Sequence, residues 1–450
     1  FSYNAFVYFW FLWLYPLDFA GLSKAISVGV VLLAWLGISL LHGALFMIPT
    51  LLCHLVSKKI RSRPFLLFTA IVGIVLAEWI PTLTDLAFPW VRISLCHYKA
   101  PMMIQTVSVF GTYGLDILIL LFAALFTLAL RSDDRKKKTA LILSAALLFT
   151  SNLIFGFLRL SFVEEGESIT VSSVQGCVLS GEKWNSQSAL DTFVGLSREA
   201  DACDLILWPE SAVPVNLATF PELLEEYQSL SAELDTPIMM GCFWKLDGKT
   251  SNSVILLDDS SVSDVYSKRH LVPFGEKMPY RAVLSRLLPV LAEINMLSSD
   301  LAEGQDSVLI ESEKGALGSI ICFESLFPEL TRQSVKDGAE MIVLVTNDSW
   351  YKDSPGVWQH LAHAVFRSVE NSRSTVRCAN SGVSAFIDSR GRIQSILGPL
   401  EQGVLTDTAS FSQETTFYTL TGDLILPCLV VLWLCAAGVL YCFERRKPNV

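Results

Sequence analysis

Long apolar stretches constrain this chain more than any other feature of its sequence. A helix needs roughly 20 mostly apolar residues to cross the hydrocarbon core of a bilayer, and six stretches approach that length. Five precede residue 160 and one follows residue 420, so that together they cover residues 3–20, 26–55, 65–82, 114–130, 139–158 and 423–443. We therefore predict membrane helices on both sides of a long intervening segment.

Composition agrees with a chain that lies only partly in the membrane. Apolar residues make up 52% of the 450 residues and charged residues 17%, which is too apolar for a soluble enzyme and too charged for a chain that lies wholly in the bilayer. The net charge is −10. Because nucleic-acid binding requires a basic surface, this balance argues against a nucleic-acid partner.

Basic residues gather in three short segments at the ends of the predicted spans. Such clusters stay on the cytoplasmic side, so we expect residues 58–63, 131–138 and 445–447 to be cytoplasmic. Alternating the spans from these points places residues 159–422 on the opposite side, which is the periplasm in a bacterium, and residue 1 in the cytoplasm. The expected location is thus the bacterial inner membrane, with the intervening domain on its periplasmic face.

The segment between about 165 and 415 has the pattern of an α/β domain. Short apolar runs rich in β-branched residues, typical of buried strands, alternate with amphipathic stretches near 187–201, 221–234 and 357–373. The runs are ITVSSVQG, DLILWPE, TPIMMGCFW, NSVILLDD, GSIICFE, MIVLVTND and TVRCANSG. The predicted domains are 1–160, with about five membrane helices, 161–418, a soluble α/β domain, and 419–450, a membrane helix with a basic cytoplasmic tail.

Three polar residues follow predicted strands, where α/β folds place their functional side chains. Glu210 ends DLILWPE, Lys268 lies in VYSK, and Cys322 follows GSII. A free thiol is only a few per cent thiolate at neutral pH, so a carboxylate base and a cation beside it would make it a competent nucleophile. Spacing alone leaves other interpretations open: a buried core cysteine, a helix-capping glutamate and a solvated loop lysine.

Longer strings around these residues resemble known families. WPESAVP at Glu210, YSKRHLVPFGE at Lys268 and CFES at Cys322 resemble the Glu, Lys and Cys motifs of the nitrilase superfamily, in that family's order. TNDSWY, VWQH and RCANSG, at 346–351, 357–360 and 377–382, are similar to apolipoprotein N-acyltransferases, the membrane-embedded branch of that superfamily. AEW and FPWVR, at 77–79 and 88–92, are weaker similarities. The resemblance implies an αββα sandwich, and about two N-terminal spans that this sequence lacks, which fits its start at Phe1.

The same resemblance implies roles for individual residues. Glu210 would be the general base, Lys268 the oxyanion stabiliser and Cys322 the nucleophile. Two carboxylates, Glu276 and Glu324, would support them, and the alternative interpretation is that both are plain ion-pair partners of Lys or Arg.

Three aromatic positions complete the expected site. Trp184 and Trp358 correspond to the substrate entrance. Phe323 departs from the family, in which many members have Tyr directly after the nucleophile. A role that requires the hydroxyl is therefore in question, while packing, or the backbone N–H as an oxyanion donor, remains possible.

No cofactor is expected. The six histidines show no HExxH or paired spacing, so a metal site is not predicted, and neither GxGxxG nor GxxxxGK occurs in a nucleotide-binding context. His360 and His363 are interpreted as packing or surface residues. Cys322 is predicted to remain outside any disulfide, because a disulfide would block its attack.

The resemblance implies acyl transfer from a membrane phospholipid, through a cysteine thioester, to the N-terminal amine of a diacylglyceryl-modified apolipoprotein. One alternative is a membrane-tethered amidohydrolase that uses the same three residues with water as the final acceptor. Apolar loops that exclude water would favour transfer, and residues 285–297 and 348–358 are candidates. Another alternative is a transporter or scaffold with an inactive domain, which an intact Glu, Lys and Cys set disfavours.

Overall fold

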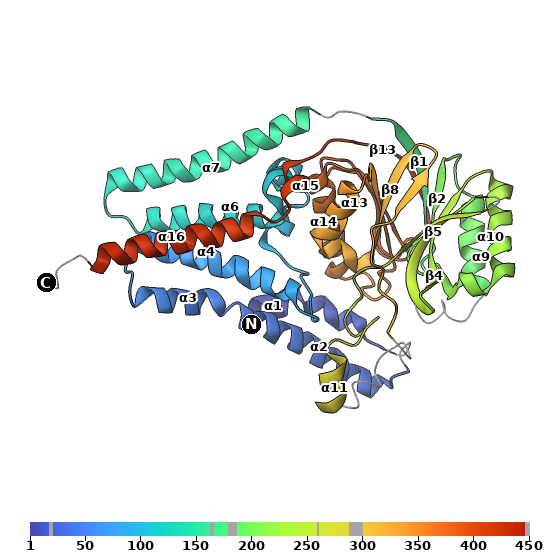
Figure 1. The fold of residues 1–450 in the computed structure, drawn as a ribbon, viewed down its shortest axis with the longest axis horizontal. Helices are drawn as coiled ribbons and strands as arrows, with labels where there is room; N and C mark the ends of the chain where they lie inside the picture. The colour runs from blue at the N-terminus through green and yellow to red at the C-terminus, as the bar shows by residue number, and fades with distance from the viewer. Residues whose placement is uncertain (18–20, 163–165, 179–186, 259–260, 288–299, 446–450) are drawn as a thin grey trace.

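The computed structural model describes residues 1–17, 21–162, 166–178, 187–258, 261–287 and 300–445. Figure 1 shows long helices at one end of the molecule and two β-sheets with their covering helices at the other. The predicted combination of a helical membrane part and an α/β domain is confirmed.

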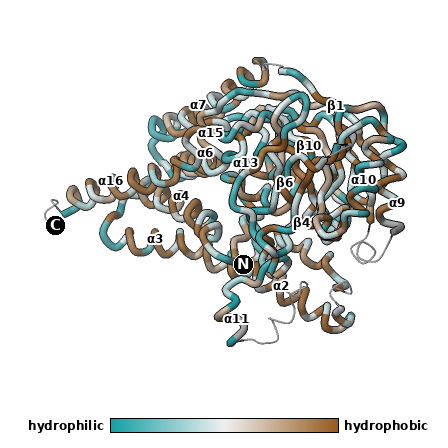
Figure 2. Tube along the Cα trace, turned by 45° about the vertical axis from the view of Figure 1, so that its right-hand side comes forward, coloured by the Kyte–Doolittle hydropathy of each residue, from teal (hydrophilic) through white to brown (hydrophobic). Residues whose placement is uncertain are grey.

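Five helical stretches are long and apolar enough to cross a membrane within the described ranges. The first, Lys24–Ser57, consists of α2 (Lys24–Leu45) and α3 (Ile48–Ser57). The others are α4 (Arg63–Trp79) with the turn that follows it, α6 (Val107–Leu130), α7 (Arg135–Ser161) and α16 (Ile425–Arg445). Figure 2 shows hydrophobic residues along much of α3, α4 and α16, as expected for helices that face lipid.

The apolar stretch at residues 3–20 does not form the predicted span. In its described part it folds into the short helix α1 (Ser2–Val7) and the 3-10 turn η1 (Phe9–Leu14). Tyr8 and Trp10 are buried in the same apolar cluster as the core of the α/β domain, and Trp13 Nε1 donates to Asp353. Protein rather than lipid therefore covers these aromatic side chains, so four spanning stretches, not five, precede the domain among the described residues. The cytoplasmic placement of residue 1, which depended on that span, loses its basis.

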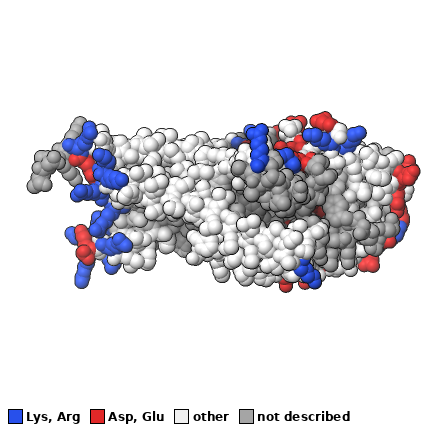
Figure 3. Space-filling model, turned by 90° about the horizontal axis from the view of Figure 1, so that it is seen from below, with Lys and Arg blue, Asp and Glu red and all other residues white. Residues whose placement is uncertain are grey.

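The described residues of the basic segments, which include only Arg445 of the third, lie together at the end of the molecule remote from the sheets. The backbone N–H of Arg61 donates to Glu444 at 3.0 Å, and Arg63, Arg131 and Lys137 line one cavity. Figure 3 shows Lys and Arg at this end, followed by a long face that is almost free of charge. This arrangement agrees with the prediction that the three basic segments share one side of the membrane.

The α/β domain is a sandwich of two sheets. The first has the order β13-β1-β2-β4-β5-β6, with β3 also paired to β4, and the second has the order β12-β11-β10-β9-β8-β7. The strands of the first are β1 (Ser168–Gln175), β2 (Leu205–Leu207), β3 (Val213–Asn216), β4 (Ile238–Leu246), β5 (Lys249–Leu257), β6 (Val262–Ser267) and β13 (Gly403–Ser410). Those of the second are β7 (Leu309–Ser312), β8 (Gly315–Ile321), β9 (Met341–Thr346), β10 (Thr375–Ala379), β11 (Ser384–Ile387) and β12 (Ile393–Leu397). Each of the seven predicted apolar runs overlaps one of these strands.

Strand β9 is apolar without interruption because both of its faces are buried. Met341, Val343 and Val345 lie in the core between the sheets, whereas Ile342 and Leu344 face the outer layer. That layer includes α13 (Pro328–Lys336) and α14 (Pro355–Asn371), while α9 (Gln187–Arg198) and α10 (Pro221–Leu234) cover the other sheet. A strand buried on both faces has no polar alternation, and the result is the αββα sandwich.

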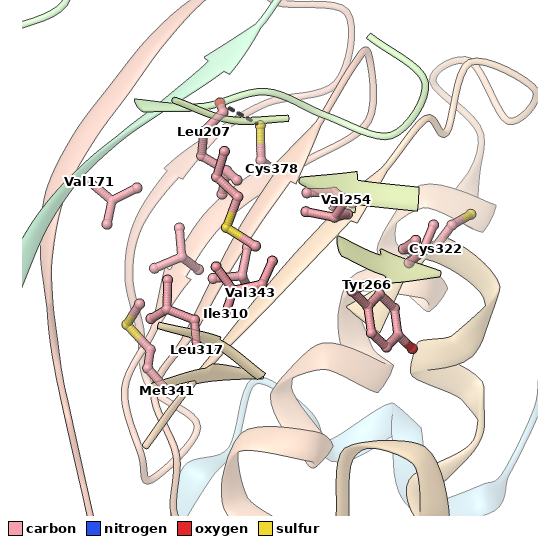
Figure 4. Packing of buried hydrophobic residues seen from close by; sticks show 14 of the residues in the cluster. Val171, Leu207, Val254, Tyr266, Ile310, Leu317, Cys322, Met341, Val343 and Cys378 are labelled. Atoms are coloured by element: carbon pink, nitrogen blue, oxygen red, sulfur yellow. Dashed lines mark hydrogen bonds between the residues drawn. The ribbon is translucent and has the colours of Figure 1, made fainter. Parts of the chain in front are cut away.

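The core between the sheets reaches the candidate nucleophile. Figure 4 shows Cys322 beside Tyr266 at one edge of this packed layer, far from Met341 at the other. Cys378 lies inside the layer, where its thiol donates to the carbonyl of Leu207. All ten cysteines are free, Cys322 among them.

Helix α14 joins the domain to the membrane helices through a buried polar contact. Arg367 and Glu370 form an ion pair within α14, and both contact Thr112 near the start of α6. A buried ion pair that also bonds to a neighbouring helix fixes the relative position of the two elements. The domain is thus held firmly against the bundle.

Candidate active site

Cys322 lies at a sharp turn directly after strand β8. It has a positive φ of 52° and begins the 3-10 turn η6 (Cys322–Leu326). A non-glycine residue in this conformation is strained, and such strain is concentrated at functional positions. The turn exposes the first N–H groups of a helix, which have no partner within it. Only 7% of the Cys322 surface is accessible to solvent.

Glu210 and Lys268 meet beside Cys322, as their positions after β2 and β6 predict. Lys268 Nζ lies 3.0 Å from Glu210 Oε1 and 3.0 Å from the carboxylate of Glu276. Asn252, on β5, donates at 2.8 Å to both carboxylates, and the N–H of Asn347 donates to Glu210 Oε2 at 2.9 Å. We call Glu210, Lys268, Glu276 and Asn252 the carboxylate cluster.

Gly241 on β4 makes room for Glu210. A Cβ at this position would lie 2.5 Å from the carbonyl oxygen of Pro209 and 2.6 Å from the Cα of Glu210. Any larger residue would displace the loop that carries the carboxylate. This close approach explains why a glycine interrupts the apolar run TPIMMGCFW.

The charges of the carboxylate cluster act on the Cys322 thiol. Burial and the nearby Glu210 raise its pKa well above the usual range, and Lys268 only partly offsets them. Burial also acts to lower the pKa of Lys268, but Glu210 and Glu276 outweigh it and raise that pKa well above its ordinary value. Lys268 is therefore a fixed cation, and Cys322 rests as a thiol, which would have to lose its proton before its sulfur could attack.

Glu324 does not belong to the carboxylate cluster, and its contacts are structural. Its carboxylate accepts from the N–H groups of Ile321 and Arg269, at 2.8 and 2.6 Å, and from the hydroxyl of Tyr266 at 2.8 Å. It thus ties the turn that carries Cys322 to the segment that carries Lys268. The two predicted supporting carboxylates differ: Glu276 contacts Lys268 directly, and Glu324 holds two backbone segments together.

A second buried set of polar groups lies on the other side of Cys322. Asp348 accepts from Arg377 Nη2 at 2.6 Å and from the Thr346 hydroxyl at 2.8 Å, and its Oδ1 lies 2.8 Å from His360 Nδ1. His360 Nε2 lies 3.1 Å from the carbonyl oxygen of Cys322, and the nearby Thr346 side chain acts to lower the pKa of the thiol, although burial and Glu210 outweigh it. We call Asp348, His360, Arg377 and Thr346 the support cluster.

Residue-by-residue reasoning assigned no role to the support cluster. His360 was interpreted as packing or surface; it is fully buried and contacts the nucleophile's backbone. The signal was present, because TNDSWY, VWQH and RCANSG each supply one or two of its members. Those strings contributed to the family resemblance, but nothing in a linear sequence shows that they converge on one cysteine.

The support cluster does not have the character of a metal site. One ligand atom from each of Cys322, Asp348 and His360 lies within 4.8 Å of the other two. The charge of Asp348 is already balanced by Arg377, and although burial opposes it, Arg377 and His360 hold the pKa of this carboxyl below its usual range. His360 uses both ring nitrogens in other contacts.

Aromatic side chains from the membrane part border the nucleophile. Phe88 lies 5.5 Å from Phe323, and Trp90 lies 5.3 Å from Tyr351 and 5.4 Å from His360, measured between ring centroids. Trp10 packs against Trp90 with the two rings tilted and their centroids 4.8 Å apart. We call Trp10, Phe88, Trp90, Phe323 and Tyr351 the aromatic wall. It joins the N-terminal segment and the loop after α4 to the α/β domain.

Comparisons with known proteins agree with this geometry. Residues 170–417 match the model of the carbon-nitrogen hydrolase family, and residues 2–125 match that of the apolipoprotein N-acyltransferase N-terminal domain. The apolipoprotein N-acyltransferase of Geobacter metallireducens is 31% identical over 430 residues, which are 92% of this chain and 79% of that protein. That of Brucella melitensis is 32% identical over 397 residues, 83% of this chain and 73% of that protein. This chain belongs to the apolipoprotein N-acyltransferase family. It is an acyltransferase with a membrane part.

Solved structures of the wider superfamily also resemble the soluble domain. Saccharomyces cerevisiae Nit3 is 20% identical, with a TM-score of 0.41 over 55% of this chain and 91% of that one. An amidase from Nesterenkonia sp. is 16% identical, with a TM-score of 0.43 over 59% of this chain and 98% of that one.

Three expected aromatic positions have different outcomes in this member of the apolipoprotein N-acyltransferase family. Phe323 is buried and packs between Phe88 and Phe327, at centroid distances of 5.5 and 5.4 Å, which agrees with a packing role. Trp358 packs against the cluster on the outer face of the second sheet, with Lys99 Nζ 5.4 Å from its ring, so an entrance role stays a prediction. Trp184 lies outside the described residues, as do residues 288–297 of the predicted shielding segment 285–297.

Proposed function

We propose that this enzyme moves an acyl chain from a membrane phospholipid to the N-terminal amine of a diacylglyceryl-modified cysteine of an apolipoprotein. One observation carries the proposal. A buried thiol beside a Glu–Lys cluster is bordered by an aromatic wall that comes in part from the membrane segments. Such a wall suits an acyl chain that arrives from the bilayer, and it keeps water from the thioester.

In the first half-reaction Glu210 takes the proton of the Cys322 thiol, and the sulfur attacks the ester carbonyl of the donor. Lys268 and the N–H of Phe323 stabilise the oxyanion that develops. The ester C–O bond then breaks, the lysophospholipid oxygen leaves with the proton from Glu210, and the acyl chain remains on sulfur.

In the second half-reaction the amine of the acceptor attacks the thioester carbonyl. Glu210 takes the proton that the amine loses and returns it to the departing thiolate as the C–S bond breaks. The products are an amide on the acceptor and the free Cys322 thiol. Glu210 thus acts as base and acid in both steps, while Lys268 keeps its proton throughout.

The same proposal includes an orientation: the catalytic domain lies on the outer, periplasmic face of the inner membrane. The described basic residues at the end remote from the domain support it, because basic segments stay on the cytoplasmic side. Lipidated precursors that emerge from translocation would meet it there.

The chemical proposal is tested by intact-mass analysis of the purified full-length protein. Incubation with phospholipid should add the mass of one acyl chain at Cys322, and a diacylglyceryl-cysteinyl peptide should then remove it as an amide. Hydrolysis of the adduct at the same rate with and without the peptide would instead favour the amidohydrolase. A protein that forms no adduct with either substrate would contradict both readings and favour an inactive scaffold.

The orientation is tested with single reporter sites after residue 137, near residue 250 and after residue 447. A membrane-impermeant reagent applied to intact spheroplasts should reach only the site near 250. Labelling of either basic segment from outside would overturn the orientation and, with it, the periplasmic acceptor.

A further inference from the structure

The cavity that Arg63, Arg131 and Lys137 line is at the opposite end of the molecule from Cys322. It has a volume of about 410 Å³ and opens among α3, α4, α6 and α7, where these helices meet the basic segments. This volume is within the range of small-ligand sites, about 300–1,000 Å³. The cavity does not belong to the active site described above.

The lining of this cavity divides into a floor and a rim. The floor is apolar and includes Leu66, Leu67, Ala70 and Leu128, all from helices α4 and α6. The rim carries three cations, Arg63, Arg131 and Lys137, which come from three different helix ends. An apolar floor beneath a cationic rim matches a molecule with a hydrocarbon part and an anionic head.

Among the residues that the structure describes, none of the three rim cations forms an ion pair. Two carboxylates near them make backbone contacts: Asp134 caps α7 by accepting from the N–H groups of Lys136 and Lys137, and Glu444 accepts from the N–H of Arg61. The positive end of the α4 dipole, at Arg63, adds to the local potential.

We infer that this cavity binds the phosphate head of an anionic phospholipid from the leaflet opposite the active site. Basic pockets between membrane helices bind such head groups, and each Lys or Arg near an anionic surface contributes about 1 kcal/mol. The lipid would be a bound component that joins α4, α6 and α7, not a substrate, because Cys322 lies at the other end of the molecule. The inference does not depend on the proposed reaction.

The experiment uses the full-length protein, stripped of lipid in detergent, with phosphatidylglycerol and phosphatidylcholine of identical chains as probes. Native mass spectrometry should show tighter binding of phosphatidylglycerol. The variant Arg63→Gln/Arg131→Gln/Lys137→Gln should weaken that binding by about fivefold per cation, which is the fold-change that corresponds to about 1 kcal/mol each. The control Arg135→Gln/Lys136→Gln/Lys138→Gln removes the same charge from the same end of the molecule but not from the cavity.

Each outcome decides the question. A lipid preference that is lost in the cavity variant and retained in the control supports the site, and phosphatidylglycerol should then raise the melting temperature of the control but not of the cavity variant. Equal losses in the two variants would show diffuse attraction and overturn it. Equal binding of the two lipids would also overturn the inference. Displacement of the lipid by glycerol 3-phosphate at similar concentration would overturn it too, and would identify a soluble phosphate as the ligand.

Discussion

The two clusters on either side of Cys322 both set carboxylates against cations, but their charge balance differs. The carboxylate cluster sets Glu210 and Glu276 against a single cation, Lys268. The support cluster sets one carboxylate, Asp348, against Arg377, with His360 between it and the nucleophile's backbone. An excess carboxylate can accept a proton, whereas a carboxylate already balanced by a guanidinium can only orient its neighbours. We therefore assign proton transfer to the first cluster and positioning to the second.

Removal of the nucleophile should have the largest effect. Cys322→Ala should abolish acyl-enzyme formation and acyl transfer while the protein remains folded, because no other thiol occupies the site. Intact-mass analysis measures the adduct, and Cys96→Ala, a cysteine in the loop between α4 and α6, is the matched control. Acylation at a wild-type rate by Cys322→Ala would refute the mechanism.

Glu210→Gln should rank second, with a loss of about 10²–10⁴-fold in acyl-enzyme formation. Since the pKa of Cys322 is raised, the thiolate fraction without a base is small and grows about tenfold per pH unit below that pKa. The residual rate of the variant should therefore rise steadily with pH, measured between pH 6 and 9.

The control for Glu210→Gln is Glu276→Gln, which removes a charge from the same cation without removing the base. Its loss should be smaller, and its pH profile should keep the wild-type shape. Equal losses with equal pH profiles would show that the two carboxylates share one role and would blur the distinction drawn within the carboxylate cluster.

His360→Gln should rank third, with a loss of about tenfold in the rate of acyl-enzyme formation and little change in the KM of the donor. The reason is geometric: without the imidazole between Asp348 and the Cys322 carbonyl, the strained turn is less well fixed. The shape of the pH profile should not change, because His360 is not expected to transfer a proton.

His363→Gln controls for general damage to α14. His363 is also buried, but it contacts the carbonyl of Trp90 and not that of Cys322. If the two variants lost activity equally, or if His360→Gln altered the pH profile, the separation between the clusters would fail.

Phe323→Tyr should have the smallest effect on activity. The backbone N–H that we assign to the oxyanion is unchanged, and the ring keeps its contacts with Phe88 and Phe327. The added hydroxyl is buried, which costs about 1–3 kcal/mol without a partner, so the melting temperature should fall while kcat stays within a few-fold of wild type. A large gain in kcat would show that a hydroxyl at this position takes part in the reaction.

Sequence reasoning succeeded where one local property decides the structure. Hydropathy located the helices that precede and follow the domain, and uninterrupted β-branched runs located strands such as β9. The prediction of a span failed at residues 3–20, because lipid and a protein surface can bury apolar aromatic side chains equally well. The choice between the two depends on Trp90 and Tyr351, about 80 and 340 residues further along the chain.

The candidate site shows the same limit. Strings around Glu210, Lys268 and Cys322 identified the residue types and their order, but not that Glu276 joins Lys268 while Glu324 holds two backbone segments. Nor did they reveal that His360 reaches the carbonyl of Cys322. These are contacts between side chains that the sheet order brings together.

The sequence by itself determined the two-part architecture, the strands that form the sandwich, and the three residues expected to carry the chemistry, because hydropathy, periodicity and motif order are written locally along the chain. Only the tertiary structure decided which carboxylate faces which cation, where the N-terminal aromatic residues are buried, and which groups surround the thiol. Burial and charge compensation depend on every neighbour in space, and most neighbours of Cys322 are distant in sequence.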